Sequence, residues 1–343
     1  MKKKLGYVLV LVLLFETFSK IFKNLDKETL FKAVQNADKE FLALGVLCMF
    51  VYWIIEAGLI DILVKKVAPK THLWTSIKTT IVGQYYSFIT PFASGGQPAQ
   101  LYTLSQDNVP GGKATAVLVG KFLLFQVTVT VYSLVLTLLR MGSLYTNLKA
   151  ASLFIFTGLF LNTVGLTLII LMAFKPVLLE VVMTKAIKFL ARMKLIKNPD
   201  KTIKNTKSHI KDYLLSIHYM KNDIGNTIYM FILSIIQVTA FFSITYFVYR
   251  ALGLSGASVL DIISLQALLY MAVSFIPIPG TVGASELGFS ILLGSIFTSN
   301  LIGVALILWR GISYYLGLVI CGVLTLMIYM FDKKTSFKKR KIA

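Results

Sequence analysis

Four ionisable side chains that lie inside otherwise apolar stretches are the residues of this 343-residue sequence best placed to do chemistry. They are Glu56, Lys121, Glu286 and Arg310. A charge near the middle of a lipid bilayer costs roughly 3 kcal/mol or more unless it is paired or hydrated. Each of the four therefore either pairs within the protein, as Glu56 and Lys121 would, or faces a polar ligand. The sequence leaves both explanations open.

Two apolar segments near these charges are interrupted by proline and glycine. Residues 91–100 read Pro-Phe-Ala-Ser-Gly-Gly-Gln-Pro-Ala-Gln, and residues 277–286 read Pro-Ile-Pro-Gly-Thr-Val-Gly-Ala-Ser-Glu. In each segment an amide or an acid follows the first proline by nine residues, and a cation follows in the next apolar run. This alignment matches Pro91 with Pro277 and Gln100 with Glu286.

Helices that begin at such breaks expose backbone amide donors inside the membrane, and glycine lets a ligand approach the backbone closely. We therefore expect a phosphate or carboxylate to bind between the two segments. The alternative is that proline and glycine only kink spanning helices and let neighbours pack closely. The candidate substrate-binding residues are Pro91, Ser94, Gly95, Gly96, Gln97, Gln100, Lys121, Pro277, Pro279, Gly280, Gly283, Glu286 and Arg310, with Glu56 as a buried charge partner.

The elements that must position these residues follow from composition. Hydrophobic residues make up 56% of the chain and charged residues 15%, a balance typical of integral membrane proteins. About 20 helical residues cross the roughly 30 Å of hydrocarbon in a bilayer. Six full spanning helices are predicted, at 5–22, 41–64, 114–139, 151–174, 225–249 and 301–331. The interrupted segments 79–104 and 259–297 are predicted to form two re-entrant helical hairpins.

The distribution of Lys and Arg predicts the orientation. If the N-terminus is cytoplasmic and each hairpin enters and leaves on one side, the inside segments hold 24 basic residues and the outside segments 7. The expected fold is thus all-α, a single membrane domain over 1–343 with both termini cytoplasmic, whose units 41–139 and 225–331 form an inverted repeat.

Two basic cytoplasmic segments, the connection 175–224 and the tail 332–343, are expected to meet anionic lipid headgroups. The connection contains an amphipathic helix near 182–193, whose spacing suits a helix in the membrane interface. An ordinary solvated connector packed on the bundle explains the same pattern equally well.

Other classes of function find less support in the sequence. Cys48 and Cys321 lie in apolar stretches, and His72, His209 and His218 lie in polar connections without partners at metal-ligand spacing. No metal or other cofactor is therefore predicted. The net charge of +20 lies mostly in short connections between apolar runs, so anionic lipid rather than nucleic acid is the expected partner. A Gly-x-x-x-x-Gly-Lys-Ser/Thr nucleotide motif is absent from the sequence.

Segments 90–100 and 277–286, together with Arg310, resemble the transmembrane domain family of lysylphosphatidylglycerol synthases. This flippase-like domain is also found in the multiple peptide resistance factor and in stand-alone membrane proteins, and the resemblance covers roughly residues 5–330. It implies a multi-pass protein of the bacterial cytoplasmic membrane that moves a phospholipid, such as aminoacylated phosphatidylglycerol, or a related lipid-linked substrate between leaflets. A separate synthase or a second copy of the chain is an expected partner.

The sequence departs from a common form of the family at the first motif. Gly96-Gln97 and Gln100 stand where that form has Gly-Glu and a nearby Arg, which replaces two charged headgroup contacts by neutral ones. In fused family members a soluble C-terminal domain performs aminoacyl transfer, whereas this sequence ends at Ala343 soon after its last apolar run. Translocation is therefore expected rather than phosphatidylglycerol lysyltransferase activity. That activity, a membrane subunit of lipid or glycan synthesis, and a non-transporting scaffold remain the alternatives.

Overall fold

The computed structural model describes residues 34–140, 157–158, 160, 162–167, 176–192, 198–221, 223–274, 276, 278–298 and 300–342. Within these ranges the chain is helical and contains no strand. The predicted span 5–22 lies outside the described residues, as do most of the span 151–174 and Pro277 of the second interrupted segment.

Four described helices are long and apolar enough to cross a membrane. Each agrees with a predicted span to within three residues at either end. They are α3 (Lys39–Val67), α6 (Gly111–Leu139), α11 (Ile224–Ala251), and a continuous helix made of α14 (Ile302–Arg310), a π-helical turn η3 (Gly311–Tyr315) and α15 (Leu316–Ile342). Because α15 continues to Ile342, the predicted basic tail extends this last helix.

Two shorter helices joined by a tight turn lie between the long helices of each half. In the first half they are α4 (Leu73–Ile89), the turn η1 (Pro91–Ala93) and α5 (Gly96–Gln106). In the second half they are α12 (Val259–Val273), the turn η2 (Pro279–Thr281) and α13 (Ala284–Leu293). Since α4 packs on α5 and α12 packs on α13, each set is a helical hairpin. Both halves thus share one order of long helix, hairpin and long helix.

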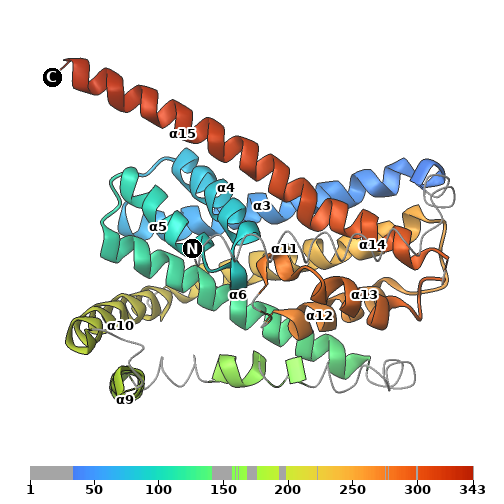
Figure 1. Cartoon of the computed structure of the whole chain (residues 1–343), viewed down its shortest axis with the longest axis horizontal. Helices are drawn as coiled ribbons and strands as arrows, with labels where there is room; N and C mark the ends of the chain where they lie inside the picture. Colours follow the sequence, from blue (N-terminus) through green and yellow to red (C-terminus); the bar gives the residue numbers. More distant parts are fainter. Residues whose placement is uncertain are drawn as a thin grey trace.

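The two halves are interlocked. Helix α3 packs along α11, its counterpart in the other half, while α4 packs on α15 and α12 packs on α6. Each hairpin therefore contacts the last long helix of the opposite half. The turns η1 and η2 contact each other near the middle of the bundle (Figure 1).

The first hairpin begins earlier than the sequence predicts. Helix α4 starts at Leu73 rather than at residue 79, and it buries Thr75, Ser76 and Lys78. Lys78 lies just before the predicted segment 79–104, and its Nζ lies 2.8 Å from Asp107 Oδ1 beyond the end of α5. This ion pair therefore links the two arms of the hairpin.

Aromatic packing fixes the second hairpin against α14. The fully buried ring of Phe289, on α13, stacks on Trp309 of α14 with ring centroids 4.8 Å apart. Glu286 lies one helical turn before Phe289, and Arg310 directly follows Trp309. This apolar contact therefore holds the two ionisable side chains at the same helix interface.

The basic connection forms two helices, α9 (Pro176–Arg192) and α10 (Pro199–Lys221). Helix α10 packs on α6, and α9 packs on α10. On α9 the apolar side chain of Phe189 is exposed beside the exposed Lys185 and Lys188. The helix expected near 182–193 is present, and its contact with lipid stays a prediction.

Candidate functional site at the hairpin turns

The two turns share an uncommon backbone conformation. Each begins at a proline, and the next two residues have positive φ, at 54° and 54° for Phe92 and Ala93 and at 59° and 52° for Gly280 and Thr281. The N–H three residues after the proline donates to its carbonyl in both turns, at 3.0 Å in η1 and 3.3 Å in η2. The halves are therefore alike in detail at the point where they meet.

This match corrects the register of the repeat. Pro91 corresponds to Pro279, which begins η2, and not to Pro277 as the sequence alignment has it. Two residues of shift place Glu286 opposite Pro98, so Gln100 is not its counterpart. By sequence either Pro277 or Pro279 could begin the turn, and the positive φ values of Gly280 and Thr281 identify Pro279 as its first residue.

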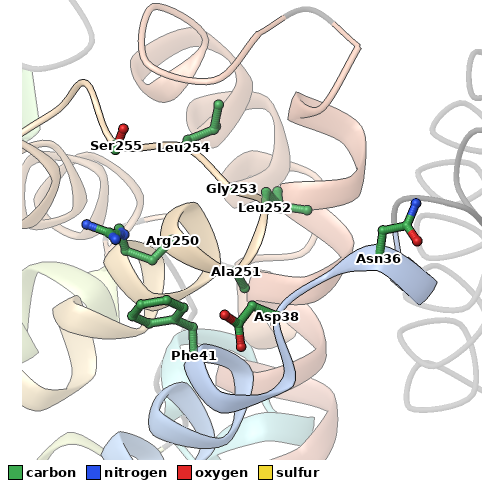
Figure 2. A pocket seen from close by; sticks show the side chains of 9 residues that line it. All are labelled: Asn36, Asp38, Phe41, Arg250, Ala251, Leu252, Gly253, Leu254 and Ser255. Carbon is green, nitrogen blue, oxygen red and sulfur yellow. The ribbon is translucent and has the colours of Figure 1, made fainter.

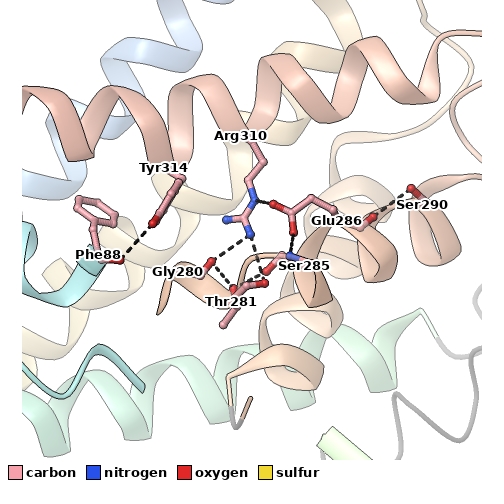
Figure 3. A network of polar contacts seen from close by, with 9 residues as sticks. Phe88, Gly280, Thr281, Ser285, Glu286, Ser290, Arg310 and Tyr314 are labelled. Carbon is pink, nitrogen blue, oxygen red and sulfur yellow. Dashed lines mark hydrogen bonds and ion pairs between the residues drawn. The ribbon is translucent and has the colours of Figure 1, made fainter. Parts of the chain in front are cut away.

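The second turn is closed by a buried ion pair (Figure 3). Arg310 Nε donates to Glu286 Oε1 at 2.7 Å, and Arg310 Nη2 donates to the Gly280 carbonyl at 3.0 Å. The other carboxylate oxygen of Glu286 accepts the backbone N–H of Gly283 at 2.6 Å. The side chains of Glu286 and Arg310 are only 6% and 8% exposed. The start of α13 is thus satisfied by the protein's own carboxylate.

One guanidinium nitrogen of Arg310, Nη1, is directed toward Tyr314, which contacts both hairpins. This nitrogen makes no hydrogen bond with the described residues and lies on the side of Tyr314 in Figure 3. The guanidinium carbon lies 5.3 Å from the centre of the Tyr314 ring. The Tyr314 hydroxyl donates to the Phe88 carbonyl of α4 at 3.1 Å. Tyr314 therefore links the second half of the protein to the first hairpin, a role that the sequence did not reveal.

Glycine at position 280 makes room for this tyrosine. A Cβ at Gly280 would lie 2.5 Å from Tyr314 Cζ, far inside the range of ordinary contact. Because η3 follows Arg310 directly and contains Tyr314, the π-helical turn sits where the long helix meets both hairpins. Such turns frequently occur at functional sites.

The turn η1 is exposed, whereas η2 is closed by the buried ion pair. Pro91, Ser94 and Gln97 are exposed, and the first turn of α5 contains no acidic residue and no side-chain cap. The N–H of Gly95 donates to Thr90 Oγ1 at 2.9 Å. The start of α5 thus presents exposed, neutral polar side chains, whereas η2, which contacts η1, is held by a buried ion pair.

Two predicted site residues instead hold the first hairpin together. A Cβ at Gly96 would lie 2.9 Å from the Gly83 carbonyl of α4, so α4 and α5 approach closely there. Gln100 is 4% exposed and packs on Gly83, whose added Cβ would lie 2.5 Å from Gln100 Cγ. Gly96 and Gln100 therefore pack within the hairpin, and their contact with a substrate stays a prediction.

The remaining predicted charges form a second buried cluster. Lys121 of α6 forms an ion pair with Glu56 of α3, which is the structural pairing that the sequence raised as an alternative. Gln237 of α11 donates from Nε2 to Glu56 Oε2 at 2.9 Å. Gln237 was not predicted, although an amide within an apolar run was the available signal. Three long helices drawn from both halves therefore meet at one carboxylate.

Comparison with known proteins agrees with this architecture. Residues 4–321 match the family described as the lysylphosphatidylglycerol synthase TM region. The chain belongs to this family. It is also similar to a UPF0104 membrane protein of Archaeoglobus fulgidus, with 20% identity over 305 residues that cover 86% of this chain and 88% of the relative. Family membership and the four long apolar helices together identify a multi-pass membrane protein.

The protein also has a concave site away from the hairpin turns. It encloses about 330 Å³ where the start of α3 meets the end of α11 (Figure 2). Arg250 lies over the Phe41 ring at 5.1 Å, and Asp38 lines the same site. None of these residues was predicted, and a headgroup cavity between the hairpins stays a prediction.

Proposed function

We propose that this protein moves a phospholipid, such as aminoacylated phosphatidylglycerol or a related lipid-linked substrate, between the leaflets of a bacterial cytoplasmic membrane. The observation that carries the proposal is the contact between two turns of like backbone conformation, one held by a buried ion pair and the other exposed and neutral. The family name, which refers to a lysylated lipid, supports this class of substrate.

In the proposed topology six helices span the bilayer, namely the four described long helices and the predicted spans 5–22 and 151–174, and the hairpins are re-entrant, entering from opposite leaflets. Both termini are then cytoplasmic, as the Lys and Arg asymmetry favours. Non-helical backbone at membrane depth is tolerated where it is buried in protein or lines a polar cavity. Contact between η1 and η2 puts the irregular backbone of both halves at one depth, where repeat-built transporters bind substrate.

The headgroup phosphate would bind between the turns. In this proposal Arg310 Nη1 would be the cationic donor from the second half, and the exposed Ser94 and Gln97 would be neutral hydrogen-bonding partners from the first. Because Glu286 already neutralises much of the charge of Arg310, the guanidinium would donate a hydrogen bond to the phosphate but attract it less strongly than a free cation would. Neutral Gln97 likewise adds no repulsion toward an anion. Rocking of the halves about the turns would then expose the headgroup to either leaflet.

Translocation of fluorescent phosphatidylglycerol in proteoliposomes tests the proposal. Gln97→Leu removes a hydrogen-bonding amide at the exposed turn, which costs about 1–2 kcal/mol of binding and slows translocation roughly fivefold to thirtyfold. Gln106→Leu, at the exposed far end of the same helix, is the matched control and keeps the wild-type rate. Arg310→Ala and Glu286→Ala are expected to abolish translocation.

The same experiment can overturn the proposal. Wild-type rates in folded Gln97→Leu and Arg310→Ala proteins would show that the turns do not handle the headgroup. If lipid extracts of a deletion strain lacked an aminoacylated lipid altogether, rather than showing it in the wrong leaflet, a membrane subunit of a synthase would be favoured instead.

A further inference from the structure

Among the described residues outside the hairpin turns, Glu56 carries the most deeply buried charge. Its side chain is 3% exposed, whereas that of its partner Lys121 is 16% exposed. A buried carboxylate at the centre of apolar helices is costly and needs compensation. Here the negative charge is neutralised by one flexible ammonium group, that of Lys121, which approaches the carboxylate from its more accessible side. Such a pair can be opened by moving the lysine while the carboxylate stays in place.

The glutamine beside Glu56 carries an unsatisfied acceptor. Gln237 is fully buried, and while its Nε2 donates to Glu56 Oε2, its Oε1 has no hydrogen-bond donor among the residues that the structure describes. A buried polar atom left without a partner costs about 1–3 kcal/mol. A protonated carboxyl would supply the missing donor. After a rotation of the carboxyl group, its O–H would donate to Gln237 Oε1 while Nε2 continues to donate to the other oxygen.

We propose that Glu56 is a proton-binding site whose protonation releases Lys121 to the phosphate of the lipid headgroup. This inference rests on the proposed function and adds its driving force. In the unloaded state the carboxylate and the ammonium neutralise each other. In the loaded state a proton on Glu56 forms the acid–amide pair with Gln237, and the Lys121 ammonium neutralises the phosphate. For an anionic lipid such as phosphatidylglycerol, one proton and one lipid bind together, so no net charge crosses the membrane.

Groups from both hairpins surround the carboxylate. Tyr52 lies one turn before Glu56 on α3, and its hydroxyl is reached by Gln84 of the first hairpin. Tyr270, on α12 of the second hairpin, lies close enough to interact electrostatically with Glu56. Lys121 is the cation that faces the carboxylate, from α6. A change of charge at Glu56 is therefore felt by both hairpins and by both halves of the repeat.

The Glu286–Arg310 pair lacks these properties. Both of its side chains are less than a tenth exposed, and both carboxylate oxygens and two guanidinium nitrogens are bonded, in part to backbone. A guanidinium also stays charged at all physiological pH values. The Glu286–Arg310 pair is therefore suited to a permanent structural role, whereas the Glu56–Lys121 pair is suited to opening and closing.

A pH gradient across vesicles tests the coupling directly. The full chain is reconstituted into phosphatidylcholine vesicles with a trace of fluorescent phosphatidylglycerol, and the probe in each leaflet is measured by chemical quenching. For one proton per lipid, a gradient of one pH unit enriches the probe up to about tenfold in the leaflet on the alkaline side. An imposed membrane potential has no effect. Vesicles without protein give the passive background.

Substitutions identify the carboxylate. Glu56→Gln cannot exchange a proton, so the pH gradient no longer enriches the probe. Asp61→Asn is the matched control, because Asp61 is a second buried carboxylate on α3 that pairs with Lys65 at 2.7 Å near the helix end. This control keeps the wild-type enrichment. An unchanged response of Glu56→Gln, or equal responses in both variants, overturns the inference.

Two outcomes separate this inference from the proposed function. Wild-type protein that moves no probe refutes translocation itself, whereas probe that equilibrates regardless of the pH gradient refutes only the coupling. Should Glu56→Gln fail to fold, proton uptake by the wild-type protein decides. Short-chain phosphatidylglycerol added to weakly buffered detergent-solubilised protein should cause uptake of one proton per lipid bound, and binding without uptake excludes the mechanism.

Discussion

Replacement of Gly280 by alanine asks whether the second turn needs glycine for its backbone angle or for the tyrosine that lies on it. The φ of Gly280 is 59°, a value that costs an L-residue roughly 1–2 kcal/mol. Phe92 occupies the corresponding position of the first turn at 54° without being glycine. The angle alone is therefore tolerated in this fold, and the neighbouring ring is the stronger reason for glycine.

The expected loss of stability has three sources. Besides the backbone angle, the new methyl group would lie 2.5 Å from Tyr314 Cζ, where ordinary contacts begin near 3.4 Å, so the ring must move by about 1 Å. Forced repacking of this kind costs about 1–3 kcal/mol. Displacement also breaks the hydrogen bond from Tyr314 to the Phe88 carbonyl, worth about 1 kcal/mol. Gly280→Ala should then destabilise the fold by about 3–6 kcal/mol.

A double-mutant cycle isolates the contribution of the ring. In a Tyr314→Ala background the methyl group meets no ring, and Gly280→Ala should cost only the 1–2 kcal/mol of the backbone angle. Equilibrium unfolding in mixed detergent micelles with increasing dodecyl sulfate measures all four proteins. If Gly280→Ala costs the same with and without Tyr314, the reasoning about the ring is wrong.

Two further predictions concern charges at opposite places in the fold. Glu286→Gln leaves the Arg310 guanidinium buried without a counter-charge and should cost about 3–5 kcal/mol of stability. The double variant with Arg310→Met should recover part of that loss. Strictly additive losses of stability would contradict a direct pair. At the start of α11, hydrogen bonds from Asn226 and from Lys66 lower the pKa of Asp223 from 3.8 to about 2. The resulting stability is present above pH 3.8 and is lost as the pH falls toward 2. The free energy of unfolding of Asp223→Asn should therefore depend less on pH across that range than that of the wild-type protein. An equally steep acid loss in the variant would show that other groups are responsible.

The sequence by itself determined the long helices and the places where two apolar segments break. Helix α6, for example, was predicted at 114–139 and extends over Gly111–Leu139. Such predictions depend on local quantities, namely the length of an apolar run against the thickness of a bilayer and the missing N–H of proline. Glu56, Lys121, Glu286 and Arg310 were also recognisable, because any charge within an apolar run stands out.

Only the tertiary structure decided which groups meet. Gln237 reaches Glu56 across 181 residues of sequence, and Tyr314 reaches Phe88 across 226. Pro279 rather than Pro277 begins the second turn, and Gln100 packs on Gly83 inside its own hairpin. These facts depend on how helices from the two halves cross and on the rotation of each about its axis. Composition and spacing fix which residues are apolar, but the packing of side chains between helices selects the partner of each polar group.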